Sequence, residues 1–190
     1  MKNSYIYSNR SGGGWFKNVV RVSLFIISTC QFLYGQNNGA TEHQVKAVFL
    51  YNFTQFITWP PASFKSPDEP FIIGIIGNDP FGSFLDETVA EEKLGTHPMR
   101  VQRYSDMKNI GHCHILYINS NDKESIKTIL SEVAEKSILT IGDHPDFCQW
   151  GGIIRFFTDQ NKIRLQINVE QSKAAGLNIS SKLLSVAKTD

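Results

Sequence analysis

The chain has 190 residues, of which 41% are hydrophobic and 12% aromatic, with 19 basic against 18 acidic side chains. This length is enough for one domain with a full core and too short for two ordinary domains. The formal charge of +1 excludes a strongly basic surface, so we expect no nucleic-acid partner and no general attraction to anionic lipid.

The first 35 residues have the composition of an export signal. Four basic residues (Lys2, Arg10, Lys17 and Arg21) precede an apolar run at residues 22–33, and small or polar residues follow it. A bilayer-spanning helix needs roughly 20 apolar residues, so this run is too short to be a permanent anchor. We predict a cleaved signal peptide at residues 1–35 and a periplasmic α/β domain at residues 36–190. Lipid attachment at Cys30 is the alternative.

The first predicted element of the mature chain is an amphipathic helix at residues 42–58. Its apolar residues recur at helical spacing, and Trp59 with the two prolines after it ends the helix, because proline lacks an amide donor. The stripe expected to face the core contains Val45, Val48, Phe49, Phe53, Phe56 and Ile57. Leu50 and Tyr51 lie off this stripe, so we expect one of them to be exposed.

Alternating strand and helix patterns follow. Continuous apolar runs are typical of strands covered on both faces, and turn residues lead from them into helical segments. In chain order we expect strands at residues 71–77, 99–104, 113–118 and 137–141, with one helix ending near residue 92 and a second at 122–136 capped by Asn121. Residues 142–150 are predicted to be an irregular loop after the last of these strands.

The carboxyl-terminal third predicts a β-hairpin and two short helices. Residues 153–157 and 163–169 are rich in β-formers and flank turn residues at 158–161. Helices are expected at residues 170–175 and at about 180–188. The complete pattern predicts a Rossmann-like, three-layer α/β sandwich, whose mainly parallel sheet has an antiparallel hairpin at one edge.

Several motifs in order resemble the YfiR family. They are QVKAVFLYNF at residues 44–53, IIGIIGNDPFG at 72–82, CHILYI at 113–118, ILTIGD at 138–143 and AAGLNISSKLL at 174–184. The resemblance implies an exported, non-enzymatic regulator that binds the periplasmic domain of a membrane-bound signalling protein, a diguanylate cyclase or a sensor kinase. Repression of a cyclase would link the chain to cyclic di-GMP and biofilm formation. We also allow for a homodimer.

The resemblance also implies disulfides that this sequence does not preserve. Cys148 matches a family cysteine, but its partner position is filled by Arg155. Cys113 matches another family cysteine, whose usual partner nearer the amino terminus is missing. A bridge between Cys113 and Cys148 is the remaining possibility, which requires a Cα separation of roughly 6 Å that sequence alone cannot establish.

Partner contact is expected from aromatic residues outside the core stripe and from the outer face of the hairpin. Large aromatics in loops commonly anchor interfaces, and an exposed sheet edge can recognise another chain. The alternative is that these aromatics pack inward and that the outer face is only solvated. The candidate partner-binding residues are Tyr51, Trp59, Phe147, Trp150, Arg164, Gln166 and Asn168.

No motif supports an enzyme, so we expect no catalytic residue, no metal and no cofactor. Gly74, Gly77 and Gly82 lack the spacing of a dinucleotide or phosphate-binding loop and are interpreted as turn glycines. No nucleophile elbow or zinc-binding helix motif occurs either.

Two rival functions belong to other classes. A periplasmic small-ligand sensor would bind in a crevice between the loops at residues 78–81 and 142–150, at the carboxyl edge of the sheet. A metal-dependent hydrolase would use His112, His114 and His144, and requires their two segments to meet.

Overall fold

The structure is a computed structural model that describes residues 40–107, 110 and 112–189. The predicted signal peptide, its cleavage site and Cys30 therefore lie outside the described residues. Within the described part, none of the helices combines the length and the apolar character that crossing a membrane requires.

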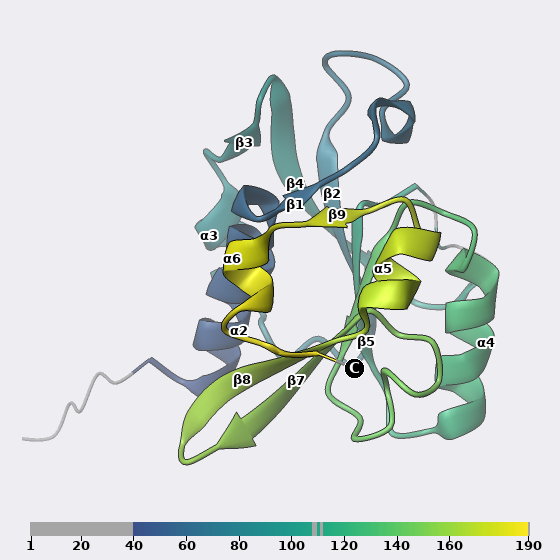
Figure 1. The fold of residues 1–190 in the computed structure, drawn as a ribbon. Helices are drawn as coiled ribbons and strands as arrows, with labels where there is room; N and C mark the ends of the chain where they lie inside the picture. The colour runs from purple at the N-terminus through teal and green to yellow at the C-terminus, as the bar shows by residue number, and fades with distance from the viewer. Residues whose placement is uncertain (1–39, 108–109, 111, 190) are drawn as a thin grey trace, which may run out of the picture. The chain divides into compact units, whose positions relative to one another are not determined.

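A twisted eight-stranded sheet runs through the described domain (Figure 1), in the order β10-β8-β7-β6-β5-β2-β4-β3. The strands are β2 (Phe71–Gly77), β3 (Lys93–Leu94), β4 (His97–Tyr104), β5 (Ile115–Asn119), β6 (Leu139–Gly142), β7 (Ile154–Asp159), β8 (Lys162–Ile167) and β10 (Lys188–Thr189). The central pairs from β4 through β7 are parallel, whereas β3 and β8 run antiparallel to β4 and β7. The predicted α/β architecture with an antiparallel hairpin is confirmed, and β3 adds a second antiparallel pair that we did not predict.

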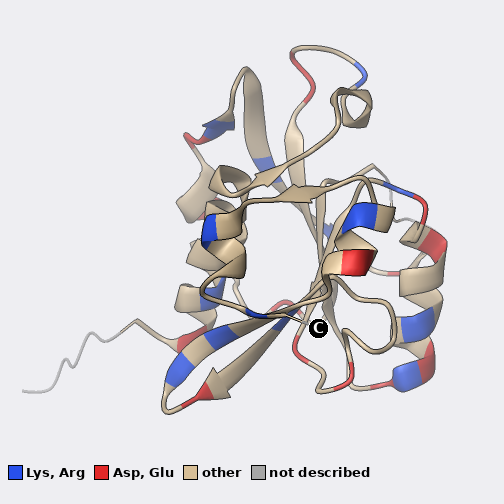
Figure 2. Cartoon of the chain, viewed as in Figure 1, with Lys and Arg blue, Asp and Glu red and all other residues tan. Residues whose placement is uncertain are grey.

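Helices cover both faces of this sheet. The helices are α2 (Glu42–Asn52), α3 (Ser83–Val89), α4 (Lys123–Val133), α5 (Val169–Ala174) and α6 (Ser181–Leu184), with 3-10 turns η2 (Phe53–Gln55) and η3 (Pro61–Ser63). Apolar residues of α2, α3 and α6 join one core cluster, and those of α4 join a second cluster on the other face. Charged residues of both signs are spread over the elements (Figure 2), as the small net charge suggests.

The first helix differs from its prediction in length and in orientation. α2 begins with a capping box between Thr41 and Gln44 but ends at Asn52. Residues 57 and 58 instead form the short strand β1 (Ile57–Thr58), which pairs with β9 (Asn178–Ile179). Phe53 and Ile57 of the predicted stripe are buried, and Phe49 and Phe56 pack against the core. Val48 is 40% exposed and Leu50 is fully buried, so the stripe was wrong at these two positions.

The structure also adds detail to the predicted hairpin and corrects the predicted cap of α4. The β7–β8 turn is two residues long, with left-handed φ values of 47° at Gln160 and 58° at Asn161, which is the geometry of tight hairpins. Asp122, rather than Asn121, caps α4 by accepting a hydrogen bond from the Ser125 amide. Gln166 is buried rather than solvated, because β10 pairs with β8 at that residue.

Candidate functional site

A buried lysine at the carboxyl edge of the sheet joins α2 to the loop after β6. Lys46 is only 4% exposed, and its ammonium lies 2.6 Å from Glu42 Oε1 and 2.9 Å from Asp143 Oδ2. The Tyr117 hydroxyl donates a hydrogen bond of 2.7 Å to the same Asp143 oxygen. These four residues, which we call the Lys46 cluster, neutralise a charge that would otherwise be costly to bury.

The Lys46 cluster holds its protons firmly. Burial alone would lower the pKa of Lys46, but hydrogen bonds to Glu42 and Asp143 raise it above its ordinary value. Burial, with the charge of Asp143, raises the pKa of Tyr117 well above its usual range. General acid–base catalysis needs a group that exchanges its proton near the working pH. Neither Lys46 nor Tyr117 meets that requirement near neutral pH.

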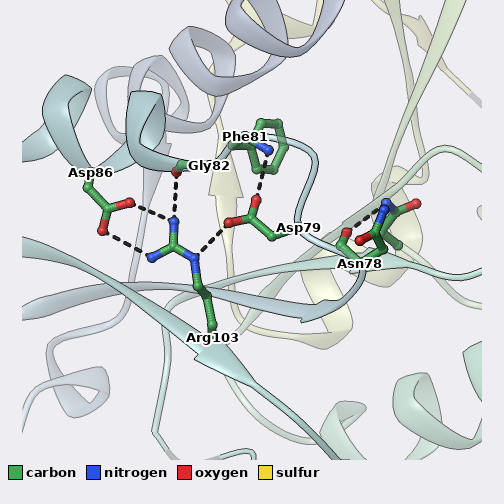
Figure 3. A network of polar contacts seen from close by, with 7 residues as sticks. Asn78, Asp79, Phe81, Gly82, Asp86 and Arg103 are labelled. Carbon is green, nitrogen blue, oxygen red and sulfur yellow. Dashed lines mark hydrogen bonds and ion pairs between the residues drawn. The ribbon is translucent and has the colours of Figure 1, made fainter.

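A second network fixes the turn between β2 and α3, where Arg103 lies among carboxylates (Figure 3). Arg103 donates from Nε to Asp79 Oδ2 at 2.7 Å and from Nη2 to the Gly82 carbonyl at 2.8 Å. It also holds Asp86 in a bidentate pair of 3.1 and 2.6 Å. Asp79 in turn accepts the Phe81 amide at 2.8 Å. Arg103 therefore donates to both the turn and α3, and this network holds the loop in place.

Replacing Lys46 by methionine is expected to lower the free energy of unfolding by about 2 kcal/mol. Loss of one partner from a fully buried ion pair costs about 3–5 kcal/mol, but here the carboxylates are partly exposed and can be rehydrated. The side chains of Glu42 and Asp143 are 49% and 36% exposed. Urea unfolding measures the change, with the exposed Lys127→Met on α4 as the matched control. Equal effects at both positions would contradict a role for the Lys46 cluster.

The three histidines proposed for a metal site do not converge. His112 and His114 precede β5, and their Nε2 atoms lie 2.7 and 3.2 Å from the Ser63 carbonyl oxygen. His144 follows β6 and stacks on Trp150 at a ring distance of 4.3 Å. Because β5 and β6 are parallel, these segments lie at opposite ends of the strands. No group of ligands suited to a metal occurs among the residues that the structure describes.

The seven candidate partner-binding residues divide into buried and accessible groups. Trp59 is 5% exposed and donates from its indole to the His114 carbonyl, and Phe147 is fully buried. These two pack inward, as the alternative interpretation held, because neighbouring core residues enclose them. Asn168 caps α5, and Gln166 is buried as described above. Partner contact through Trp59, Phe147 or Gln166 would require rearrangement of the fold, whereas Asn168 is only half-buried and its contact stays a prediction.

The remaining three candidates keep some exposed surface. Tyr51 is half-buried and donates to Glu92 Oε2 at 2.8 Å. Trp150 is half-buried beside His144, and Arg164 is exposed on β8. Partner contact by these three residues stays a prediction.

The sequence of the described domain matches a known family. A profile of YfiR/HmsC-like proteins matches residues 43–188. The chain belongs to the YfiR/HmsC-like family. The matched region contains the Arg103 network and all of the Lys46 cluster except Glu42, which lies one residue before it. No curated protein matches the sequence.

The structure of a conserved domain protein from Vibrio cholerae O1 biovar El Tor has a similar fold. Its TM-score is 0.51 at 10% identity, and the similarity covers 78% of this chain and 60% of that one. This YfiR/HmsC-like chain thus spans less than two thirds of that structure's length. Such low identity supports similarity of fold alone.

The two cysteines of this YfiR/HmsC-like domain are not joined. Cys113 and Cys148 are both buried and neither is in a disulfide, so the Cys113–Cys148 bridge is not formed. Cys113 precedes β5 and Cys148 lies in the loop beyond the carboxyl end of β6. A Cβ at Gly74 would lie 3.4 Å from Cys113 Cβ, close to the roughly 3.5–4.5 Å found in disulfides. Position 74 therefore lies within reach of Cys113 for a bridge but holds a residue without sulfur.

Sequence reasoning missed Lys46 as the centre of a buried cluster. Lys46 follows Glu42 by four residues, the spacing of a helical ion pair, but that spacing is common on solvated faces. Its second partner, Asp143, is 97 residues away. Asp143 ends the family motif at 138–143, and its position directly after a buried strand was the available signal.

Proposed function

We propose that this chain is an exported regulator that binds the periplasmic domain of a membrane-bound signalling protein and represses it without turning over a substrate. A diguanylate cyclase is the favoured target and a sensor kinase the second, so the output would be cyclic di-GMP level and biofilm formation. The observation that supports this is the YfiR/HmsC-like match across residues 43–188. The firmly held protons of the Lys46 cluster agree with a role in binding rather than catalysis.

We place the partner contact at the outer edge of β8. β10 pairs only with Gln166 and Ile167, so residues 162–165 have no strand on their outer side among the described residues. Such an edge offers backbone groups to an added strand. Exposed Lys162 and Arg164 give this half of β8 positive charge, which favours an extended, acidic segment of the partner.

A groove beside this edge would receive apolar side chains of the same segment. It has a volume of about 530 Å³ and lies between the start of α2 and the hairpin. Val45, Phe49 and Ile163 supply its apolar wall. Val48, also on α2, is 40% exposed but does not line this groove.

The test is recovery of the partner from crosslinked envelope membranes with a tagged chain. We expect a membrane signalling protein with a periplasmic domain, and about tenfold weaker recovery by Arg164→Glu, which corresponds to about 1.4 kcal/mol. Arg100→Glu is the matched control, because Arg100 is exposed on β4 toward the other end of the sheet. Deletion of the gene should raise cyclic di-GMP.

Two outcomes would count against these proposals separately. Repeated recovery of no membrane signalling protein would contradict the function. Equal recovery by Arg164→Glu and Arg100→Glu would leave the function standing and reject the β8 edge as the contact.

A further inference from the structure

A pocket of about 370 Å³ opens at the amino edge of the sheet, at the end of the strands away from the Lys46 cluster. Three separate segments build it: η3, the residues before β5 and the connection from α4 to β6. Its wall includes Ala62, Ser63, Ile110, Cys113, Lys136 and Ile138. The volume lies within the range of small-molecule sites, which combine an apolar lining with a few polar groups.

The first polar group in the pocket is a buried hydroxyl without a partner. Ser63 is 6% exposed, and its Oγ has no hydrogen-bond partner within the described part of the chain. Buried hydroxyls are nearly always paired. The Ser63 carbonyl accepts from His112 at 2.7 Å and from His114 at 3.2 Å. These contacts fix the backbone of Ser63 at the pocket wall, and its buried hydroxyl stays without a partner among the described residues.

The second polar group is the ammonium of Lys136. Lys136 is exposed and forms no ion pair with any residue that the structure describes. Lys136 is among the residues that line the pocket.

The rest of the wall combines the apolar side chains of Ala62, Ile110, Cys113 and Ile138 with two more polar residues, His112 and Ser137. Cys113 is 1% exposed, and burial raises the pKa of its thiol to about 12, so the sulfur stays neutral. Ile110 and Ile138 line the same space. An apolar surface beside an ammonium, the hydroxyls of Ser63 and Ser137 and the His112 imidazole suits a molecule that has an acidic head and an apolar body.

We propose that this pocket binds a small organic monocarboxylate. The carboxylate accepts hydrogen bonds from the Lys136 ammonium and the Ser63 hydroxyl, and the apolar body packs against Ile110, Cys113 and Ile138. This inference goes beyond the proposed function and does not depend on it, because it concerns the isolated domain.

Titration calorimetry on the purified mature chain tests the site with 3-phenylpropanoate, benzoate and hexanoate, each paired with its neutral amide. We expect saturable binding of at least one acid and weaker binding of its amide. Lys136→Gln should weaken binding of the acid about fivefold, the effect of one exposed ion pair. Ser63→Ala should weaken it about threefold to tenfold, the effect of one hydrogen bond.

The control is Lys127→Gln, which removes the same charge from an exposed position on α4 and should bind like the unmodified chain. Ser63→Ala should melt at the same temperature as the unmodified chain, since its hydroxyl has no partner to lose among the described residues. Absence of saturable binding by all three acids at millimolar concentration overturns the proposal. Equal effects of Lys136→Gln and Lys127→Gln also overturn it.

Discussion

Replacing Gly152 by alanine is expected to destabilise the fold by about 3 kcal/mol, at the upper end of overpacking effects. A Cβ at Gly152 would lie 2.1 Å from Phe147 Cε1 and 2.2 Å from Cδ1. A Cβ at Gly142 would lie 2.6 Å from the same ring. Phe147 is fully buried, so its ring cannot move aside into solvent. Urea unfolding followed by circular dichroism measures the loss.

Two further variants separate the clash from the general effect of removing a glycine. Gly95 has a φ of 62° and no neighbour within 4 Å of its Cβ position, so Gly95→Ala should cost only about 1 kcal/mol from backbone strain. In a Phe147→Leu background, Gly152→Ala should cost less than in the unmodified chain, because the smaller side chain relieves the contact. If Gly152→Ala costs no more than Gly95→Ala, the ring does not fill the space between the two glycines.

The same contact explains why the loop after β6 was misread from sequence. Phe147 and Trp150 lie among polar residues, a pattern that favours exposed interface anchors. Phe147 packs inward because Gly142 and Gly152 leave room for its ring. The glycines were visible in the sequence, but their distance from Phe147 depends on how the loop returns to β7.

The strands of the central sheet could be predicted because each has a recognisable pattern in its own sequence. β2, β5 and β6 are continuous apolar runs, and burial on both faces requires that composition. The strands β1, β9 and β10 have two residues each and exist only through pairing with distant segments. No local pattern distinguishes such pieces from coil or from the end of a helix, so they were missed.

The orientation of α2 was predicted only in part, and the pocket at the amino edge was missed, for a related reason. The apolar pattern of α2 is compatible with more than one buried face, and the long-range contact of Lys46 with Asp143 selects the face that contains Leu50. The pocket combines segments near residues 62, 113 and 136, which the topology alone brings together. The general preference of α/β sheets for ligands at the carboxyl edge predicted a ligand crevice at the opposite end of the strands.

The stability of the domain should fall by about 3 kcal/mol as the pH decreases from 6.5 to 4, because His114 must remain neutral in the folded chain. His114 is fully buried. Its Nδ1 accepts the Ile72 amide at 3.1 Å, so its Nε2 carries the hydrogen that faces the Ser63 carbonyl. Burial, with a smaller effect from nearby His112, lowers the pKa of His114 from 6.5 to about 4. Protonation of Nδ1 would also remove its acceptance of the Ile72 amide and place two N–H groups against each other.

The sign follows from which state binds the proton more tightly. Between pH 6.5 and 4 the unfolded chain is protonated at this residue and the folded chain is not, so each pH unit of decrease favours unfolding by up to about 1.4 kcal/mol. The contribution is fully present above the unfolded pKa and is lost as the pH falls toward the folded value. Carboxylates with lowered pKa, such as Asp86, add their own loss at lower pH.

Urea unfolding at a series of pH values from 7.5 to 4 tests this dependence on His114. His114→Asn should be less stable than the unmodified chain at neutral pH, since it loses the two hydrogen bonds, but its stability should decline less between pH 6.5 and 4. His43→Asn, which removes an exposed imidazole from α2, should decline as steeply as the unmodified chain. A decline in His114→Asn as steep as that of His43→Asn would assign the acid sensitivity to other groups, because each variant loses one imidazole and only His43→Asn keeps the buried one.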